Sequence, residues 1–521
     1  MKPSIFNDVI GPVMRGPSSS HTAAAHRIGT IMRQFHHPEN SNICVEFDRH
    51  GSLATTYEGQ GSAMGLISGL CGLSILDPGM TMYKKLPEQH KFKIEFKVTD
   101  FEATHPNTYK ISLTENSYET LQIVAISTGG GMIKVIGLNG FPVSINGDLY
   151  ETFICFKNES TEGIEELNLK LKHHFSTETE LIKKGKDNYL LIIKSRKSIL
   201  KEVELIIREY KGVLWVKEIE PVLPVMSGSC QALPFTDMHE MLEFNEEKEA
   251  DLAGLALHYE CARGGIDESR VLALMREIAV HIEYSIREGL KEKSYPGRIL
   301  GHQSHLILAA EKEGKIISSP LNIVLSYVTA LMESKSSMEI IVAAPTAGSC
   351  GTLGGTIFGI ADQLSKDFDD IVKAFLAAGL IGVFIADKYT FAAEEGGCQV
   401  ECGAASAMAA AGLVQLMGGS ARHAVNASSM ALQNCLGMIC DPVADRVEVP
   451  CLGKNILAAT NALNSANMAI AGFDPVIPLN EVIDAMKKVG AEIPRSLCCT
   501  GLGGLSQTPA SLRLHEKLSR L

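Results

Sequence analysis

Five cysteines lie close together within residues 390–453, and their surroundings suit metal chemistry. Cys398 follows a Gly-Gly pair, Cys440 opens an Asp-Pro turn and Cys451 follows a proline. Such breaks in regular structure hold thiols at the edges of loops, where several can converge on one metal centre. Clustered cysteines in a chain without a secretion signal favour metal or catalytic work over disulfides. The remaining two cysteines of the group are Cys402 and Cys435.

The alternative for each cysteine is a structural role, because a free thiol packs like a small hydrophobic side chain. Cys402 and Cys435 suit that alternative, since one begins a helical run and the other lies in an apolar segment. Cys398, Cys440 and Cys451 suit it less well. No dense C-x-x-C pattern is present, so the spacing alone leaves a metal cluster and structural packing both open.

A second polar group precedes a predicted helix at residues 23–28. Residues 18–22 read Ser-Ser-Ser-His-Thr and follow Pro17. Serines in front of a helix act as N-caps, and the free N–H groups at that end can bind an anion such as a carboxylate. Capping and ligand binding are both open, although three serines ending in a histidine exceed what a cap requires.

A third candidate is the glycine-rich stretch at residues 345–355, PTAGSCGTLGG, which leads into a helix. Tight packing alone would explain its glycines. It lacks the Lys-Ser/Thr pair of a P-loop, which argues against nucleotide binding. The sequence likewise has no lysine in a recognisable pyridoxal phosphate motif.

Several long motifs together resemble the iron–sulfur-dependent L-serine dehydratases, also called L-serine ammonia-lyases. GGCQ at 396–399, CDPVADRVEVPC at 440–451 and PTAGSCG at 345–351 resemble the α-domain signatures of that family. Nearer the N-terminus, GPVMRGPSSSHTAAAHRIG, GSLATTYEGQGS, HPNT and STGGG resemble its β-domain motifs. The likeness covers nearly the whole chain, in the β-then-α order of the single-chain form of the family.

The resemblance implies a [4Fe–4S] cluster held by Cys398, Cys440 and Cys451, with one iron open to substrate or water. An open iron would act as a Lewis acid on the serine hydroxyl while a base removes the α-proton. The expected products are pyruvate and ammonia. L-serine is therefore the expected small-molecule partner, and the family suggests a homodimer.

The resemblance also assigns roles to individual side chains. His21 is a candidate for proton transfer, and Cys350 is expected in the pocket rather than on the metal. The expected catalytic residues are His21, Ser20, Gln60 and His105. The expected substrate-binding residues are Ser18, Ser19, Ser20, Thr22, Thr346 and Ser349.

The chain departs from the family pattern at residues 59–63. Many members carry Gly-His-Gly-Thr-Asp, whereas this chain has Gly-Gln-Gly-Ser-Ala. Gln60 can hydrogen-bond a substrate but cannot accept a proton near neutral pH. The identity of the base is therefore open, with His50 and His105 as neighbouring candidates. Two further functions stay open: a related lyase such as a cysteine desulfidase, and a non-catalytic amino-acid sensor.

A second departure concerns the cysteine with which some family members end, and which reaches the fourth iron. This chain ends in EKLSRL, while Cys498 and Cys499 lie before a glycine-rich loop at 501–504 and could approach the pocket.

The elements that position these residues predict an α+β protein with three domains. Residues 1–150 form a mixed α/β domain of the serine dehydratase β type, residues 151–225 a small ferredoxin-like, ACT-like module, and residues 226–521 an all-α domain of the α type that carries the cluster. Alternating apolar residues predict strands of the first domain at 43–48, 92–101, 108–113 and 121–127.

The module is predicted from the order of its elements, β-α-β-β-α-β, with strands at 152–156, 177–182, 189–194 and 213–219 and helices at 164–174 and 200–211. Beyond it, a 3.6-residue periodicity and an N-cap at Asp267 predict a helical domain. Its expected helices lie at 250–262, 269–293, 323–332, 371–388, 404–416, 421–436, 455–470 and 481–489.

Composition limits the class of protein. The 521 residues are 45% hydrophobic and 21% charged, which is ordinary for a globular chain. The net charge of −12 argues against a nucleic-acid partner. The apolar stretches at 374–386 and 403–421 are expected to be buried helices rather than membrane spans. Thirteen cysteines without a signal peptide predict a reducing cytoplasm.

Overall fold

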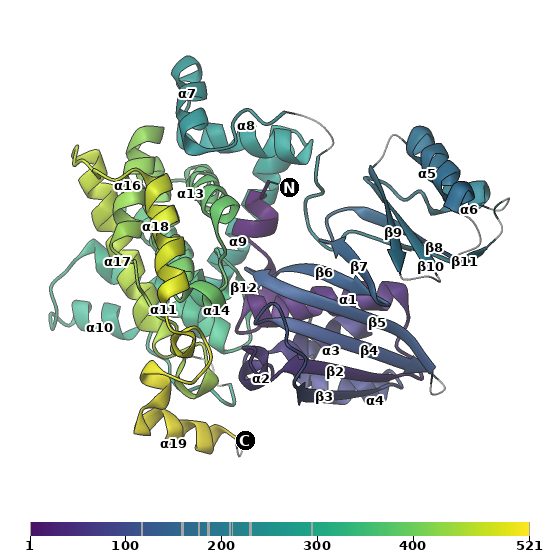
Figure 1. The fold of residues 1–521 in the computed structure, drawn as a ribbon. Helices are drawn as coiled ribbons and strands as arrows, with labels where there is room; N and C mark the ends of the chain where they lie inside the picture. The colour runs from purple at the N-terminus through teal and green to yellow at the C-terminus, as the bar shows by residue number, and fades with distance from the viewer. Residues whose placement is uncertain are drawn as a thin grey trace.

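The computed structural model has three parts, which Figure 1 shows as a sheet domain, a small module beside it and a large helical domain. The predicted α+β class, with an N-terminal α/β region and a C-terminal helical region, is confirmed. The structure describes residues 2–115, 118–157, 161–175, 178–184, 188–207, 210, 212–228, 232–292 and 295–519. Three predicted elements, the strand at 177–182 and the helices at 200–211 and 269–293, extend outside the described residues. The positions concerned are 177, 208, 209, 211 and 293.

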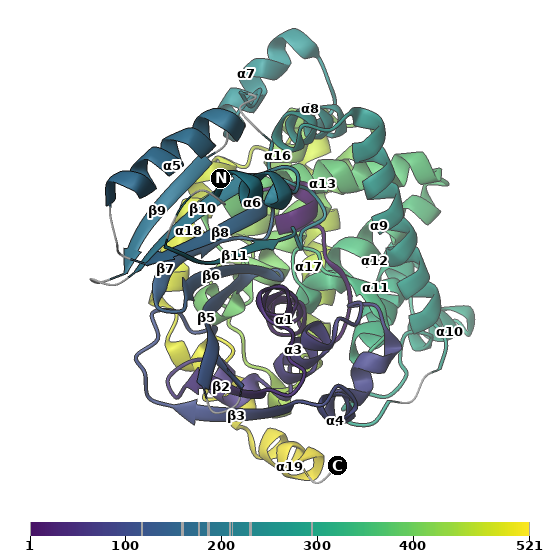
Figure 2. The same cartoon turned by 90° about the vertical axis from the view of Figure 1, so that its right-hand side faces the viewer.

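The sheet domain is built on six strands in the order β3-β2-β4-β5-β6-β7. β2 and β3 are parallel and the other pairs antiparallel. Ile43, Val45 and Phe47 alternate along β2 and are buried, so one face of the sheet forms a core against the helices α1 and α3. Figure 2 shows these helices side by side. The bounds are β2 (Asn42–Asp48), β3 (Lys93–Thr99), β4 (Thr108–Glu115), β5 (Tyr118–Gly129), β6 (Met132–Leu138), β7 (Phe141–Ile145), α1 (Ala24–Phe35), α2 (Leu53–Thr56), α3 (Ser62–Cys71) and α4 (Leu86–Gln89).

Glycines let α1 and α3 touch backbone to backbone. A Cβ atom on Gly65 would lie 2.1 Å from the carbonyl oxygen of Thr22, and one on Gly29 would lie 2.4 Å from that of Leu66. Only glycine permits such approaches. The contact fixes residues 18–22, which precede α1, against residues 59–61, which precede α3.

The module has a four-stranded antiparallel sheet in the order β11-β8-β10-β9. Phe153 and Cys155 on β8 join the core of the sheet domain, whereas Ile154 and Phe156 pack in a second core with α5 and α6. Both faces are covered, which explains the unbroken apolar run in β8. A regulatory, ACT-like role and the domain boundaries stay predictions. The bounds are β8 (Tyr150–Lys157), α5 (Thr161–Phe175), β9 (Glu178–Lys184), β10 (Asn188–Ser195), α6 (Leu200–Ile207) and β11 (Val213–Ile219).

The helical domain packs around α13 and α15, whose alanines and glycines are almost all buried. Asp267 caps α9 as predicted, accepting a hydrogen bond from the backbone N–H of Arg270 at 2.8 Å. Among the described residues, no helix is both long and apolar enough to cross a bilayer. The bounds are α7 (Met238–Lys248), α8 (Leu252–Gly264), α9 (Glu268–Gly289), α10 (Leu306–Lys312), α11 (Pro320–Ser336), α12 (Cys350–Gln363), α13 (Phe368–Lys388), α14 (Ala393–Gly396), α15 (Ala404–Leu416), α16 (Ala421–Gln433), α17 (Cys451–Ile470), α18 (Leu479–Glu492) and α19 (Pro509–Leu518).

The N-terminal segment belongs to the helical domain by its contacts. The Ser4 hydroxyl and the Ile5 N–H donate hydrogen bonds to the buried Glu260 carboxylate at 2.5 and 2.9 Å. Strand β1 (Val13–Arg15) then pairs with β12 (Ile340–Val342). The chain therefore crosses from the helical domain into the sheet domain just before residue 18, and the serine-rich loop lies at the interface.

Candidate active site

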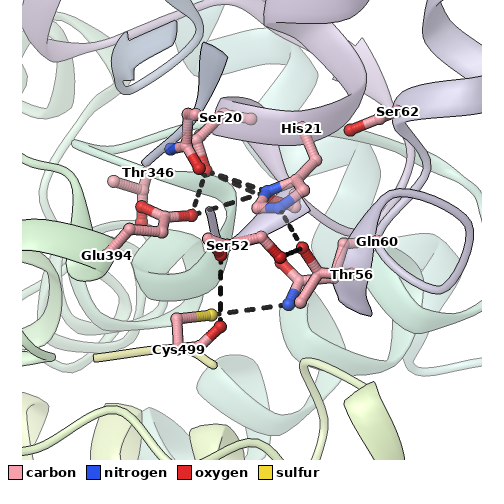
Figure 3. Close-up of polar contacts among 12 residues, drawn as sticks. Ser20, His21, Ser52, Thr56, Gln60, Ser62, Thr346, Glu394 and Cys499 are labelled. Carbon is pink, nitrogen blue, oxygen red and sulfur yellow. Dashed lines mark hydrogen bonds and ion pairs between the residues drawn. The ribbon is translucent and has the colours of Figure 1, made fainter. Parts of the chain in front are cut away.

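The loop at residues 18–22 is a compact helical turn that continues into α1. Of the two roles left open for these serines, capping is not seen for Ser18, whose side chain makes no capping hydrogen bond. The Ser18 and Ser20 hydroxyl oxygens instead lie 3.1 and 3.2 Å from Nδ1 of His21. All three residues are buried, so the loop turns its polar groups toward one another and toward the helical domain (Figure 3).

Thr56 fixes the tautomer of His21. The Thr56 hydroxyl donates its one hydrogen to the Ser52 carbonyl oxygen at 2.7 Å, so it accepts from Nε2 of His21 at 2.8 Å. Nδ1 is then the nitrogen that carries the lone pair. Burial lowers the pKa of His21, an effect that the nearby Glu394 carboxylate partly opposes. Burial has the larger effect, so the imidazole is neutral near pH 7, and its basic nitrogen faces Ser20.

Glu394, on α14 of the helical domain, completes this group. One carboxylate oxygen accepts a hydrogen bond from the Ser20 hydroxyl at 3.1 Å and lies 3.6 Å from Nδ1 of His21. The other oxygen is buried and has no hydrogen-bond partner within the part of the chain that the structure describes. A buried carboxylate oxygen without a donor is a site at which a cationic or hydrogen-bonding ligand would be stabilised.

Gln60 is directed away from His21 and toward a sulfur. Its side-chain amide donates a hydrogen bond to Sγ of Cys499 at 3.4 Å (Figure 3). The backbone carbonyl oxygen of Gln60 accepts a hydrogen bond from the Thr22 hydroxyl at 3.0 Å. Thr22 therefore holds the Gln60 segment in place, rather than presenting its hydroxyl to the His21 pocket.

Two of the three predicted cysteine ligands meet at one point. The sulfurs of Cys398 and Cys440 and a carboxylate oxygen of Glu401 lie within 4.8 Å of one another. Hydrogen bonding with the Cys398 and Cys499 thiols, together with burial, raises the pKa of Cys440 well above its ordinary value. The ammonium group of Lys454 donates to Cys398 Sγ at 3.8 Å and is paired with Asp441 at 2.7 Å.

Cys451, at the start of α17, borders this group. It interacts electrostatically with Cys398 and Glu401, and burial raises its pKa to about 12. Cys350 packs beside it in a small apolar cluster. The buried thiols thus converge from the loops around α14 and α17 and from the C-terminal segment.

Cys402 and Cys435 are buried, and Cys402 interacts electrostatically with Cys398, Glu401 and Cys451. The Asn455 side-chain amide donates to Cys402 Sγ at 3.7 Å, and the Asn461 amide donates to Cys435 Sγ at 3.6 Å. Both asparagines lie on α17. These contacts suit the structural role that the sequence favours for the two cysteines.

The glycine-rich stretch contacts both halves of the site. The Thr346 hydroxyl donates to Glu401 at 2.7 Å and lies 3.2 Å from the Ser349 hydroxyl. The Ala347 N–H donates to the Ser19 hydroxyl at 3.1 Å. Burial raises the pKa of Glu401 to about 7. The two loops expected to bind substrate therefore touch one another, with Glu401 beside them.

His105 is held apart from the other expected catalytic residues. Its Nε2 lies 2.9 Å from a carboxylate oxygen of Glu395, and its Nδ1 accepts a hydrogen bond from the Asn107 N–H at 3.1 Å. Among the described residues, it makes no polar contact with His21 or with a cysteine sulfur. His105 therefore joins the HPNT turn to α14.

Sequence reasoning did not single out Glu394, Glu401, Lys454 or Thr56. The sequence did carry one signal, because two glutamates directly precede the GGCQ motif and place an acid within four residues of Cys398. Thr56 and Lys454 had no comparable signal. They become recognisable only through their contacts with His21 and Cys398.

Comparison with known proteins gives the family. Residues 174–506, well over half of the chain, match the family model described as serine dehydratase alpha chain. The chain is 34% identical to a Bacillus subtilis protein named "Probable L-serine dehydratase, alpha chain" over 285 residues, 54% of this chain and 95% of that protein. It is 47% identical to a Latilactobacillus sakei protein of the same name over 186 residues, 36% of this chain and 89% of that protein.

A third relative is the Escherichia coli protein named "L-serine dehydratase 1", which is 31% identical over 284 residues. That match covers 52% of this chain and 62% of the relative. The region that matches the family model includes Glu394, Glu401 and the cysteines of the site described above. The chain belongs to the serine dehydratase alpha chain family.

Proposed function

We propose that this protein is an L-serine ammonia-lyase, which converts L-serine to pyruvate and ammonia. The observation that carries the proposal is the meeting of the buried thiols of Cys398 and Cys440, with Cys451 beside them, next to the polar group of Ser20, His21 and Glu394. The relatives named as L-serine dehydratases support the same reaction. The protein is thus an enzyme, a lyase that removes ammonia.

The residues present fit an iron–sulfur cluster. Thiolates are the ligands of such clusters, and these thiols come from separate segments and are all buried. Lys454 would offset part of the negative charge, since it donates to Cys398. We assign Cys398, Cys440 and Cys451 as the ligands of a [4Fe–4S] cluster. When bound, a cluster with an open iron supplies a Lewis acid that makes hydroxide a tolerable leaving group.

The chain's own residues bind the substrate and move its proton. The Ser18 and Ser19 hydroxyls and the N–H groups of that turn offer donors to the substrate carboxylate, while the Ser20 hydroxyl donates to Glu394. The unpartnered oxygen of Glu394 offers an acceptor to the substrate ammonium. His21 holds its lone pair on Nδ1 beside these groups and takes the α-proton. The meeting of the sheet and helical domains shields the reaction from water.

The alternatives are less well supported. A cysteine desulfidase would need the same site, and no relative reported above carries that name. A non-catalytic sensor would not need a basic nitrogen held in one tautomer beside a buried carboxylate. Profiling of L-serine, L-threonine and L-cysteine separates these functions.

The first test is pyruvate release from L-serine by protein purified and reconstituted without oxygen. We expect serine-dependent pyruvate that disappears on exposure to air. A protein with a full cluster that releases no pyruvate from serine would contradict the proposed reaction.

The ligand assignment has its own test. Single substitution of Cys398, Cys440 or Cys451 by serine is expected to abolish the charge-transfer absorbance of the cluster, because each thiolate holds one iron. Cys402→Ser and Cys435→Ser are the matched controls, since these thiols are buried in the same domain and accept hydrogen bonds from asparagine amides. Loss of absorbance only in the two controls would overturn the assignment.

We also propose a homodimer, a cytoplasmic location and no nucleic-acid partner. The net charge of −12 supports the last point, because a like-charged surface repels the phosphate backbone. Sedimentation equilibrium of the reconstituted protein tests the assembly, and a monomer over the micromolar range would contradict it.

A further inference from the structure

Cys499 lies in the same small cluster of buried side chains as Cys398 and Cys440. Its thiol is hydrogen-bonded to Cys440, and it is 5% exposed. We infer that Cys499 is a fourth sulfur ligand, which holds the remaining iron in the resting protein. The inference rests on the proposed function, because it concerns the cluster that the other three cysteines bind.

The backbone fixes Cys499 beside Cys440. The Cys440 N–H donates to the carbonyl oxygen of Leu497 at 2.8 Å, and the Cys499 N–H donates to the carbonyl oxygen of Cys440 at 2.9 Å. These two backbone hydrogen bonds pair Cys440 with Cys498 as in a parallel β-sheet. Cys499 also has a φ of 59°, in the left-handed region, where a residue that is not glycine is strained. A strained residue held by two backbone hydrogen bonds is typical of functional sites.

The sheet domain holds the same residue from the opposite side. The Ser52 hydroxyl donates to the Cys499 carbonyl oxygen at 3.3 Å, and the Thr55 hydroxyl donates to the carbonyl oxygen of Thr500 at 3.3 Å. The Gln60 amide donates to the Cys499 sulfur itself. Hydrogen bonds to sulfur stabilise a thiolate and tune an iron–sulfur cluster, so Gln60 is a positioning residue for this ligand.

Cys498 provides a matched control. It is the neighbouring residue and is buried like Cys499, with 3% of its surface exposed against 5%. It lies instead near the backbone of Gly397 and the side chains of Arg495 and Tyr389. A ligand role for Cys499 and none for Cys498 is thus a sharp distinction between adjacent thiols.

The test compares the wild type, Cys499→Ser and Cys498→Ser after anaerobic reconstitution with ⁵⁷Fe. In the wild type and in Cys498→Ser we expect Mössbauer spectra in which all the irons have the isomer shift of sulfur coordination. In Cys499→Ser we expect one iron with the higher shift of oxygen coordination. That iron should be lost to ferricyanide about tenfold faster or more, giving the EPR signal of a [3Fe–4S] cluster.

Each outcome has one meaning. A wild-type spectrum that already contains one distinct iron would overturn the inference, and this measurement does not depend on the folding of a variant. Equal iron loss from all three proteins would overturn it as well. Both results leave the proposed function intact if pyruvate is released. A wild type that binds no cluster and releases no pyruvate would instead contradict the proposed function.

Discussion

At the scale of single residues, the state of His21 is determined by a hydroxyl on another segment. Thr56 has only one proton to donate, and the Ser52 carbonyl oxygen receives it. His21 must therefore donate from Nε2 and keep Nδ1 basic, beside Ser20 and Glu394. This is a defined place for a base in a chain whose Gln60 cannot serve as one.

His21→Gln is the direct test of that base. Glutamine keeps an N–H donor for Thr56 but has no basic nitrogen, so kcat for pyruvate release should fall by about 10² to 10⁴. The cluster absorbance should not change, because His21 contacts no sulfur. His36→Gln, at the far end of α1 beside Glu115, is the control and should keep wild-type kcat. A His21→Gln enzyme of nearly full activity would show that the base lies elsewhere.

Glu394→Gln tests the proposed site of the substrate ammonium. The carboxylate oxygen without a partner should bind that cation, and a hydrogen bond to a charged group is worth about 1.5–3 kcal/mol. We therefore expect KM for L-serine to rise by about tenfold to a hundredfold, as measured by initial rates of pyruvate release. An unchanged KM together with a reduced kcat would place Glu394 in proton transfer alone.

At the scale of elements, the contact of α1 with α3 positions the serine-rich loop. Gly29, Gly65 and Gly69 bring the two helices together at backbone distance. The loop at 18–22 directly precedes α1, and the segment at 59–61 directly precedes α3. The contact between the two helices therefore sets where His21 and Gln60 lie.

Gly65→Ala tests that arrangement. A Cβ atom 2.1 Å from the Thr22 carbonyl oxygen cannot be accommodated unless the helices separate. We expect a loss of stability of about 1–3 kcal/mol, together with reduced activity, since overpacking of a tight contact shifts the backbone. Gly453→Ala on α17 is the control for stability, because a Cβ atom there meets nothing within 4 Å. Urea titration of both variants provides the measurement, and equal midpoints would contradict this account.

At the scale of the whole molecule, the site exists because two domains close on one another. The sheet domain contributes the serine-rich loop, Thr56 and Gln60, and the helical domain contributes Glu394, Glu401 and the cysteines. The N-terminal residues bind the two together, through Glu260 and through the pairing of β1 with β12. Stability of the interface and of the site are therefore linked.

The pH dependence of unfolding follows from the buried histidines of α1 and its loop. Burial lowers the pKa of His26 below its ordinary value of 6.5, and burial does the same for His21. Above pH 6.5 neither state binds the proton, so the full stability is present. As the pH falls below 6.5, the unfolded chain takes up protons that the folded chain does not, and stability falls by about 1.4 kcal/mol per pH unit per histidine at most.

His26→Gln isolates one of these groups. Its amide can replace the donation from Nε2 to the Leu73 carbonyl oxygen, which spans 2.8 Å. Anaerobic urea titrations between pH 7.5 and about 5.5 should show a smaller decline of the unfolding free energy in the variant than in the wild type. Parallel curves would mean that His26 does not titrate differently in the two states.

The sequence by itself determined the class of fold, the motifs and most of the elements. All eight predicted helices of the C-terminal domain are present, because their apolar periodicity is a local property. The shorter α7, α10 and α19 were not predicted, since a few turns at the surface carry little periodicity. The family resemblance, carried by contiguous motifs such as GGCQ, was equally local.

Only the tertiary structure decided which residues meet. The contact of His105 with Glu395 and that of Gln60 with the Cys499 sulfur could not be read from the sequence. Glu394 and Thr56 had no assigned role, although they define the state of His21. The contacts of Glu394, His105 and Gln60 join segments at least 290 residues apart, and the contact of Thr56 with His21 joins segments 35 residues apart. Sequence spacing does not encode such contacts, because they arise only when the elements and the two domains pack together.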